Sequence, residues 1–220
     1  MKKTSIASVT VMTVLCATGI VFGQGSLTPP GAPAPTMKTL DQVEPRTPIS
    51  STLYMISNSG SYYLTTNLTG ELTIAANNVS LDLNGFSIIG TGWNAILQSG
   101  ARSNLHIFNG VISAPNGNGI DFSISSASAN GILENLRIYN CLIHGIVVGS
   151  GFTIRNCTVY NSDLAGIWLD GDSRVTECTV TGCGTGLKLV GTGAYVSGNI
   201  LKGNADNYDF AAGNQLNLLI

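Results

Sequence analysis

The chain has 220 residues, of which 10% are charged, whereas about 25% are charged in an average soluble protein. Its 10 Lys and Arg residues form no basic run, and 12 Asp and Glu residues outnumber them. Binding to a phosphate backbone therefore lacks its electrostatic basis, and we expect no nucleic-acid partner.

Residues 1–23 have the pattern of a secretory signal peptide. Lys2 and Lys3 form a basic start, residues 9–22 are an apolar run, and small residues surround the expected cleavage before Gln24. The run is too short to span a bilayer in the mature protein. We therefore expect a secreted protein, extracellular or periplasmic, with no membrane span after cleavage.

Two segments without a repeat follow. Six of the seven prolines lie between Pro29 and Pro48, which predicts an extended Pro-rich segment over residues 24–52. The stretch SGSYYLTTNLTGELTI (59–74) predicts short strands that lead into a repeat, so residues 53–76 are expected to form an N-terminal cap.

A repeat dominates residues 77–205. The similar stretches RNCTVYNS (155–162), TECTVTGC (176–183) and SGNILKGN (197–204) follow one another at a constant step of 21, and the earlier units align with steps of 25. Three apolar columns result: Leu83, Phe108, Leu133, Ile154, Val175, Val196; Phe86, Val111, Leu136, Cys157, Cys178, Asn199; and Ile88, Ser113, Ile138, Val159, Val180, Leu201. Two more are Ala95, Ile120, Ile146, Ile167, Leu187 and Leu97, Phe122, Val148, Leu169, Leu189, with the variable column Ile96, Asp121, Val147, Trp168, Lys188 between them.

These columns predict an all-β fold. Apolar positions two apart are typical of strands with one buried face, and so short a unit cannot bury that face alone. Equivalent strands must therefore pair in parallel from unit to unit, with right-handed crossovers. We predict a right-handed parallel β-helix, a solenoid of about six to seven short coils over residues 77–205, with residues 206–220 as a C-terminal cap. Constant steps disfavour a β-sandwich, and the consensus of a leucine-rich repeat is missing.

Asn residues are expected at the corners of the coils, because Asn tolerates a left-handed backbone and bonds to nearby backbone groups. Like side chains at equivalent corners can then stack from coil to coil. The candidates are Asn109, Asn135, Asn156, Asn161 and Asn204.

Three segments carry a family resemblance: GSLTPPGAPAPTMKTLDQVEPRTPIS (25–50), ANNVSLDLNGFSIIG (76–90) and NADNYDFAAGN (204–214). They resemble secreted bacterial right-handed β-helix proteins of the pectate-lyase-like superfamily. The resemblance covers nearly the whole mature chain and implies the β-helix fold. The superfamily includes polysaccharide lyases, glycoside hydrolases, surface adhesins and phage tail parts, and most members of the resembling group have no known activity. The resemblance therefore does not choose a function.

The stretch NSDLAGIWLDGDSR (161–174) holds the candidate carboxylates of a glycoside hydrolase, which are Asp163, Asp170 and Asp172. The favoured interpretation of Asp170-Gly171-Asp172 is a turn between coils, because Asp and Gly are typical turn residues. The Asn-Thr-Asp, Asp-Asp, Gly-His-Gly and Arg-Ile-Lys signatures of polygalacturonase-like hydrolases are missing.

A pectate lyase would need a calcium cluster and a basic Arg or Lys. Arg137, Arg155 and Arg174 are outward candidates, but no column holds several carboxylates, and Glu134 beside Arg155 is expected to form a surface ion pair. The two histidines stand in different columns without a nucleophile beside them. We expect neither a metal site nor a cofactor.

Four cysteines follow the signal peptide: Cys141, Cys157, Cys178 and Cys183. The middle two are neighbours in an inward column, about 4.8 Å apart and within disulfide range, but stacked side chains point in the same direction. The outer two share a column with Ser162 between them, which places them too far apart for a bond. Small apolar fillers are favoured over a disulfide framework, which export would permit, and the sequence leaves the redox state open.

Trp168 is the largest side chain at an outward position and the centre of a candidate ligand site. With Arg137, Asp170, Asp172 and Lys188 around it, the ring suits the apolar face of a sugar, whose hydroxyls need hydrogen-bond partners. In the alternative interpretation, loops of the longer coils or the C-terminal tail cover the ring.

The function expected from these features is that of a non-enzymatic surface, matrix or carbohydrate-binding module, with a polysaccharide or cell-surface glycan as its partner. The alternative is a polysaccharide lyase or glycoside hydrolase with an unrecognised active site. A groove lined by charged side chains from neighbouring coils would favour the enzyme, and the sequence shows no such column.

Overall fold

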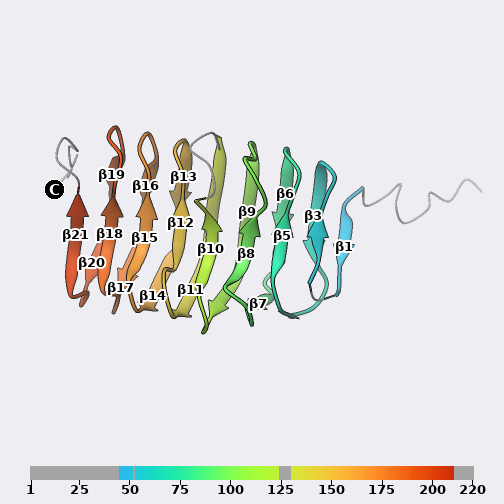
Figure 1. The fold of residues 1–220 in the computed structure, drawn as a ribbon, viewed down its shortest axis with the longest axis horizontal. Helices are drawn as coiled ribbons and strands as arrows, with labels where there is room; N and C mark the ends of the chain where they lie inside the picture. The colour runs from blue at the N-terminus through green and yellow to red at the C-terminus, as the bar shows by residue number, and fades with distance from the viewer. Residues whose placement is uncertain (1–44, 52, 124–129, 211–220) are drawn as a thin grey trace, which may run out of the picture. The chain divides into compact units, whose positions relative to one another are not determined.

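A computed structural model describes residues 45–51, 53–123 and 130–210. Every regular element in these ranges is a β-strand, and the strands stack in successive coils (Figure 1). None of the described residues forms a helix that could cross a membrane. The expected signal peptide and residues 211–220 of the expected C-terminal cap lie outside the described residues.

The strands form two sheets. The first has 13 described strands: β1 (Thr47–Ile49), β3 (Gly60–Leu64), β4 (Leu68–Thr69), β6 (Val79–Asp82), β7 (Ser87–Ile89), β9 (Leu105–Ala114), β11 (Gly131–Cys141), β13 (Phe152–Arg155), β14 (Thr158–Ser162), β16 (Arg174–Thr176), β17 (Thr179–Thr181), β19 (Tyr195–Ser197) and β20 (Ile200–Lys202). The second has eight: β2 (Met55–Ile56), β5 (Leu72–Ile74), β8 (Asn94–Gln98), β10 (Asn118–Phe122), β12 (Ile146–Val148), β15 (Ala165–Leu169), β18 (Thr185–Leu189) and β21 (Asp206–Phe210).

Equivalent strands of successive coils pair in parallel in both sheets, as β13, β16 and β19 do in the first sheet and β15, β18 and β21 in the second. A regular coil contributes two strands to the first sheet and one to the second, in the order β13, β14, β15. The described coils make about seven turns, so the predicted parallel β-solenoid is confirmed.

The core is one cluster of buried apolar side chains inside the coils. Val159 has no exposed surface and lies between Ile138 and Val180 in the register, as predicted. Its neighbour Thr158 is half-buried and belongs to an outward column. The alternation of inward and outward residues is therefore confirmed in these coils.

Each coil turns through corners with a left-handed backbone (positive φ). The corner residues form three columns: Asn78, Asn104, Asn130, Gly151, Asp172, Gly193; Asn109, Asn135, Asn156, Glu177, Gly198; and Asn140, Asn161, Gly182, Gly203. Because Gly and Asn adopt this conformation at little cost, these columns account for much of the Gly and Asn content. Stacking of Asn side chains is also confirmed, since Asn161 Nδ2 donates to Asn140 Oδ1 over 2.7 Å.

Several predicted columns are wrong in the earlier coils, by two residues at Leu83, whose place in the first column belongs to Leu81, and by one residue in β8 and β9. The first-sheet columns pass through Ile107, Gly110 and Ile112, and the second-sheet column passes through Ile96. Phe108, Val111 and Ser113 therefore lie in outward columns. Ile96 takes the column position predicted for Ala95, which is itself buried, and Leu97 takes the outward position predicted for Ile96.

Unequal corners cause this error. Asp82 pairs with Phe108, a step of 26 in the numbering, whereas Ser87 pairs with Val111, a step of 24. The corner between Asp82 and Ser87 is thus two residues longer than the corresponding corner between Phe108 and Val111 in the next coil. A constant step of 25 therefore cannot align the strands on both sides of this corner.

Coil-like pairing extends beyond residues 77–205. Ile49 of β1 is fully buried and pairs with Leu64 of β3, inside the segment expected to be extended. Strands β2 to β5, which lie within the segment expected to be an N-terminal cap, pair with later strands of the two sheets. At the other end β21 continues the second sheet beside β18.

Candidate functional site

The outer face of the second sheet carries the column that contains Trp168. On β15, Trp168 lies between Val147 of β12 and Lys188 of β18, as predicted. The column continues through Asp209 on β21, whose Oδ2 lies 3.0 Å from Lys188 Nζ. Trp168 and Lys188 are therefore neighbours on one face, and Lys188 is ion-paired on the side away from the ring.

A second outward column, at the first position of these strands, holds a ladder of polar side chains. Asn118 Nδ2 donates to Asn94 Oδ1 over 3.2 Å, and Asn118 Oδ1 accepts the backbone N–H of His144 over 3.1 Å. His144 Nδ1 in turn accepts the backbone N–H of Ala165 over 3.0 Å. Each side chain thus joins its coil to a neighbouring coil.

The ladder stops at Ala165, which has no polar atom in its side chain. The backbone N–H of Thr185, next in the column, donates instead to Leu164 O over 2.8 Å. A methyl group therefore occupies the place where the two preceding coils have Asn118 and His144. This shortening of the side chain accounts for a hollow in the outer face.

A pocket of about 510 Å³ lies at this hollow. Its lining includes His144, Asp163, Ala165, Trp168, Lys188 and Asp206. A smaller pocket of about 130 Å³ adjoins the other side of the ring and includes Asp170, Val147 and Val190. Trp168 therefore contributes to both pockets.

Trp168 itself is half-buried, and its Nε1 is buried with no hydrogen-bond partner among the described residues. An indole N–H usually finds a partner when it is buried. The ring of His144 lies 5.3 Å from that of Trp168, at an angle of 47°. The indole ring thus lies beside the His144 imidazole, and its own N–H has no hydrogen-bond partner among the described residues.

His144 is held as a neutral imidazole. Burial lowers its pKa, although the contact with Ala165 and the charge of Asp121 act in the opposite direction. Because Nδ1 accepts the Ala165 N–H, the proton of the neutral ring is on Nε2. His144 therefore offers the pocket a hydrogen-bond donor and no basic lone pair.

The predicted site residues are only partly brought together. Trp168 and Lys188 share the larger pocket, and Asp170 lines the smaller one, where its Oδ1 accepts the N–H of Gly171. Asp172 is a corner residue with φ of 46°, and its N–H donates to Thr192 O. Arg137 is exposed on β11 of the first sheet, beside Thr158 and away from the Trp168 column.

The predicted site lacked three ionisable residues of the lining, which are His144, Asp206 and Asp163, the last predicted only as a candidate hydrolase carboxylate. His144 lies two residues before the inward Ile146, as Asn118 lies two before Ile120. The sequence therefore contained this column, but reading only the inward positions overlooked it. Asp206 opens the last described strand, where the apolar pattern is weak.

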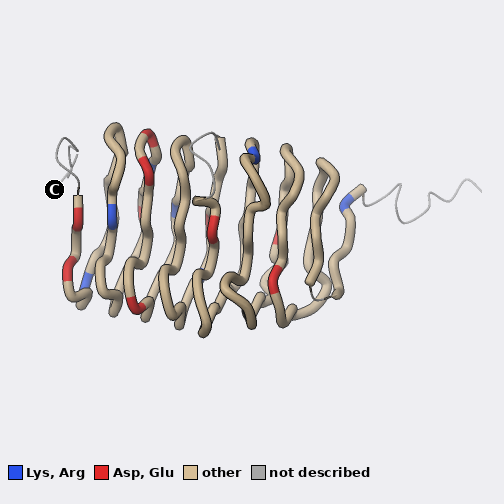
Figure 2. The backbone as a smooth tube through the Cα atoms, in the orientation of Figure 1, with Lys and Arg blue, Asp and Glu red and all other residues tan. Residues whose placement is uncertain are grey.

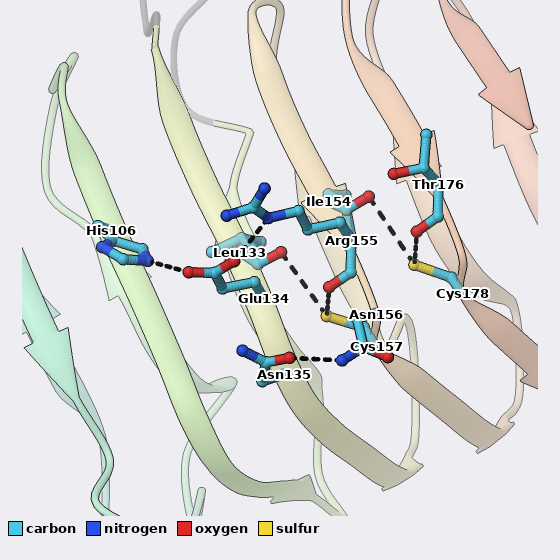
Figure 3. Close-up of polar contacts among 10 residues, drawn as sticks. All are labelled: His106, Leu133, Glu134, Asn135, Ile154, Arg155, Asn156, Cys157, Thr176 and Cys178. Carbon is cyan, nitrogen blue, oxygen red and sulfur yellow. Dashed lines mark hydrogen bonds and ion pairs between the residues drawn. The ribbon is translucent and has the colours of Figure 1, made fainter.

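Charged residues are sparse along the described coils (Figure 2), and the first sheet holds one compact group. His106 Nε2 lies 2.7 Å from Glu134 Oε1, and Arg155 Nε donates to Glu134 Oε2 over 2.5 Å (Figure 3). Although partial burial raises the pKa of Glu134, the hydrogen bonds from Arg155 and His106 lower it overall. The expected pair of Glu134 and Arg155 is confirmed, and His106 joins it, so this group links β9, β11 and β13.

Cys141, Cys157, Cys178 and Cys183 are buried free thiols. Cys157 and Cys178 occupy adjacent coils, and their Sγ atoms lie 3.3 Å from the carbonyl oxygens of Arg155 and Thr176 (Figure 3). Burial raises the pKa of Cys141 to about 11 and also raises that of Cys183. The thiols of Cys141 and Cys183 are therefore protonated at neutral pH, and all four cysteines pack as small core residues.

Comparison with known families gives one match. The family model described as "Right handed beta helix region" matches residues 72–217, which is more than half of the chain. Comparisons with curated proteins and with solved structures give no significant match. Among the described residues, no group of three or more His, Cys, Asp or Glu side chains is placed to hold a metal ion.

Proposed function

Because the chain belongs to the right-handed β-helix family, we propose that it is a secreted, non-enzymatic repeat protein that binds carbohydrate at a cell surface or in a matrix. The pocket beside Trp168 is the binding site. The observation that carries the proposal is an indole ring at the wall of a pocket of about 510 Å³, together with ionisable and hydrogen-bonding side chains.

This combination suits a sugar. The apolar face of a pyranose ring packs on an aromatic ring, and its hydroxyl groups need donors and acceptors nearby. His144 supplies a donor, and the carboxylates of Asp163 and Asp206 supply acceptors.

The bonding of the same side chains supports binding rather than catalysis. The single lone pair of the neutral His144 ring is used by the Ala165 N–H, so His144 is not free to act as a general base. Lys188, the basic side chain beside Trp168, is ion-paired with Asp209. A polysaccharide lyase or glycoside hydrolase would need a base that is available to the substrate.

The test uses the fluorescence of Trp168 during titration with a panel of neutral, acidic and amino oligosaccharides. The chain has two tryptophans, so Trp93→Phe leaves Trp168 as the reporter, and Trp93 is 75% exposed and distant in sequence from the pocket. We expect a saturable change with at least one oligosaccharide. Ala165→Asn, which restores the polar side chain of the preceding coils, should narrow the pocket and weaken binding while the protein stays folded.

Two controls complete this test. Trp168→Ala should lose binding measured by calorimetry, whereas Tyr160→Ala, which removes an exposed aromatic ring from the first sheet, should not. The parallel assay follows the release of reducing ends and unsaturated products from acidic polysaccharides. If the wild type degrades a polysaccharide and Ala165→Asn loses that activity, the protein is an enzyme and not a binding module. If sugar binding persists in Trp168→Ala, the pocket beside Trp168 is not the binding site.

A further inference from the structure

We propose that the pocket beside Trp168 selects saccharides that carry a protonated amino group, of the glucosamine type, over neutral saccharides and over uronates. The inference rests on the proposed function and names the class of sugar. It follows from the charges around the pocket, from their separation along the coil axis, and from the half-buried indole ring in the pocket wall.

The lining is acidic. Asp163 and Asp206 are exposed carboxylates, and Lys188 is the cationic side chain of the lining. The ammonium group of Lys188 lies 3.0 Å from Asp209 Oδ2, so a carboxylate outside the pocket already balances its charge. A ligand in the pocket therefore meets two uncompensated negative charges.

The two carboxylates lie in different coils, on the same side of the sheet. Asp163 immediately precedes Leu164 and β15, whereas Asp206 is in the column of Ala165, two coils further on. Equivalent positions two coils apart are separated by about 9.6 Å, twice the strand spacing. The positions of Ala165 and Asp206 are thus separated by about the length of two linked sugar rings, and Asp163 lies two residues before Ala165, so amino groups two rings apart on an oligosaccharide can approach both carboxylates.

His144 does not offset this charge. Its ring is neutral, since burial lowers its pKa and Nδ1 accepts a backbone N–H. Asp121, in the column of Trp168, adds another carboxylate to this face of the sheet, bonded to Asn118 and Ser123. A uronate carboxylate would therefore be repelled, and an ammonium group attracted.

Trp168 strengthens the same preference. A cation close to the face of an indole is attracted by the ring quadrupole, and Trp is the best of the aromatic side chains for this contact. An amino sugar can thus pack its ring on the indole and bring its ammonium group toward the carboxylates. A neutral sugar gains only the packing.

The experiment compares two tetrasaccharides that differ in one substituent: the β-1,4-linked tetramer of glucosamine, and cellotetraose, which has a hydroxyl in place of each amino group. Tetragalacturonate is the acidic probe. Titrations use the Trp93→Phe protein at mildly acidic pH, where sugar amines are protonated and Asp side chains are ionised. We expect the glucosamine tetramer to bind most tightly and its affinity to fall with added salt.

Variants assign the effect to the pocket. Asp163→Asn and Asp206→Asn should each weaken binding of the glucosamine tetramer roughly two- to fivefold, the range of exposed ion pairs, and leave cellotetraose unchanged. Asp172→Asn is the matched control, because Asp172 lies at a corner outside the lining and Asn tolerates its left-handed backbone. It should change neither affinity.

The outcomes separate the two proposals. If cellotetraose binds as tightly as the glucosamine tetramer, or tetragalacturonate binds more tightly, the amino-sugar inference is wrong and the carbohydrate-binding function stands. If the glucosamine tetramer binds but neither Asp variant weakens it, the selectivity does not come from these carboxylates and the inference is also overturned. If none of the panel binds, both proposals fail.

Discussion

Along the three corner columns, the coils before residue 123 use Asn, whereas the coils after residue 130 begin with Asn and end with Gly. Every coil needs corner residues with a left-handed backbone, and the earlier coils supply Asn, as at Asn104 and Asn109. In the last coils Gly takes over, as at Gly182 and Gly203. Asn adds a side-chain hydrogen bond to the next coil, whereas Gly adds conformational freedom alone. The corner conformation is therefore a requirement of the fold, and the residue that supplies it is variable.

Coil length differs between the same regions. Paired positions in the first sheet advance by 21 from coil to coil after residue 130, as from Ile154 to Val175 and Val196. Before it they advance by unequal steps, from 15 between Thr47 and Tyr62 to 26 between Asp82 and Phe108. Inward side chains still stack in register in both regions, so the core preserves the pairing of strands, whereas the length of the corners varies.

The largest effect is expected from a charge inside the regular coils. Val159→Asp would bury a carboxylate without a partner in a column where Val159 has no exposed surface, and the protein should fail to fold. Thr158→Asp, one residue away in an outward column, should change the free energy of unfolding by no more than about 0.5 kcal/mol. Circular dichroism and thermal melting check both variants, and equal melting would contradict the assignment of inward and outward faces.

How much could be predicted from the sequence follows from coil length. In the regular coils after residue 130 the columns through Val159, Val180 and Trp168 are all confirmed, because constant corners keep the period visible. In the longer coils, corners of unequal length hide the register, and Phe108 was placed inward when it faces out.

The candidate site was predictable only where it followed that period. The position of Trp168 beside Lys188 follows from one column. The pocket depends on the absence of a long side chain at Ala165 and on the approach of Asp206 from two coils away, and a repeat alignment of inward residues shows neither. Arg137 was expected on a strand close to Trp168, although β11 and β15 belong to different sheets.

A smaller effect is expected at a column of glycines that the longer and the regular coils have in common. Gly119, Gly145, Gly166 and Gly186 begin the second-sheet side of successive coils, and a Cβ at Gly166 would collide with Val180 Cγ1. Gly166→Ala should therefore lower the free energy of unfolding by about 1–3 kcal/mol, as overpacking does. Urea denaturation measures the change. Gly92→Ala, where a Cβ meets open space, is the control, and equal midpoints for the two variants would show that the core is looser here than the contacts indicate.

Glu177 is an exception among the corner residues, which are mostly Asn or Gly, and its replacement is expected to stabilise the protein. It occupies a column between Asn156 and Gly198 with φ of 56°, a conformation that costs an ordinary residue roughly 1–2 kcal/mol. Glu177→Asn should therefore raise the free energy of unfolding by about 0.5–1 kcal/mol, measured as a shift of the urea midpoint at constant slope. Glu177→Gln removes the charge and keeps the strain, so it should not stabilise. A gain of the same size in both variants would assign the effect to charge instead of backbone.

The smallest effect is expected at the group that joins the two regions, because Glu134 on β11 binds His106 of β9 and Arg155 of β13. Its hydrogen bonds lower the pKa of Glu134 below the ordinary value of 4.5, even though burial acts against them. A carboxyl group with a lowered folded-state pKa stabilises the fold above its unfolded-state pKa, and that stabilisation is lost as the pH falls through the lower folded-state value. Wild type should therefore lose more stability than Glu134→Gln when acidified below about pH 4.5, by less than about 1 kcal/mol because Arg155 is exposed. Melting temperatures of the two proteins across this range give the difference, and parallel curves would show that the group contributes nothing to the contact between the long and the regular coils.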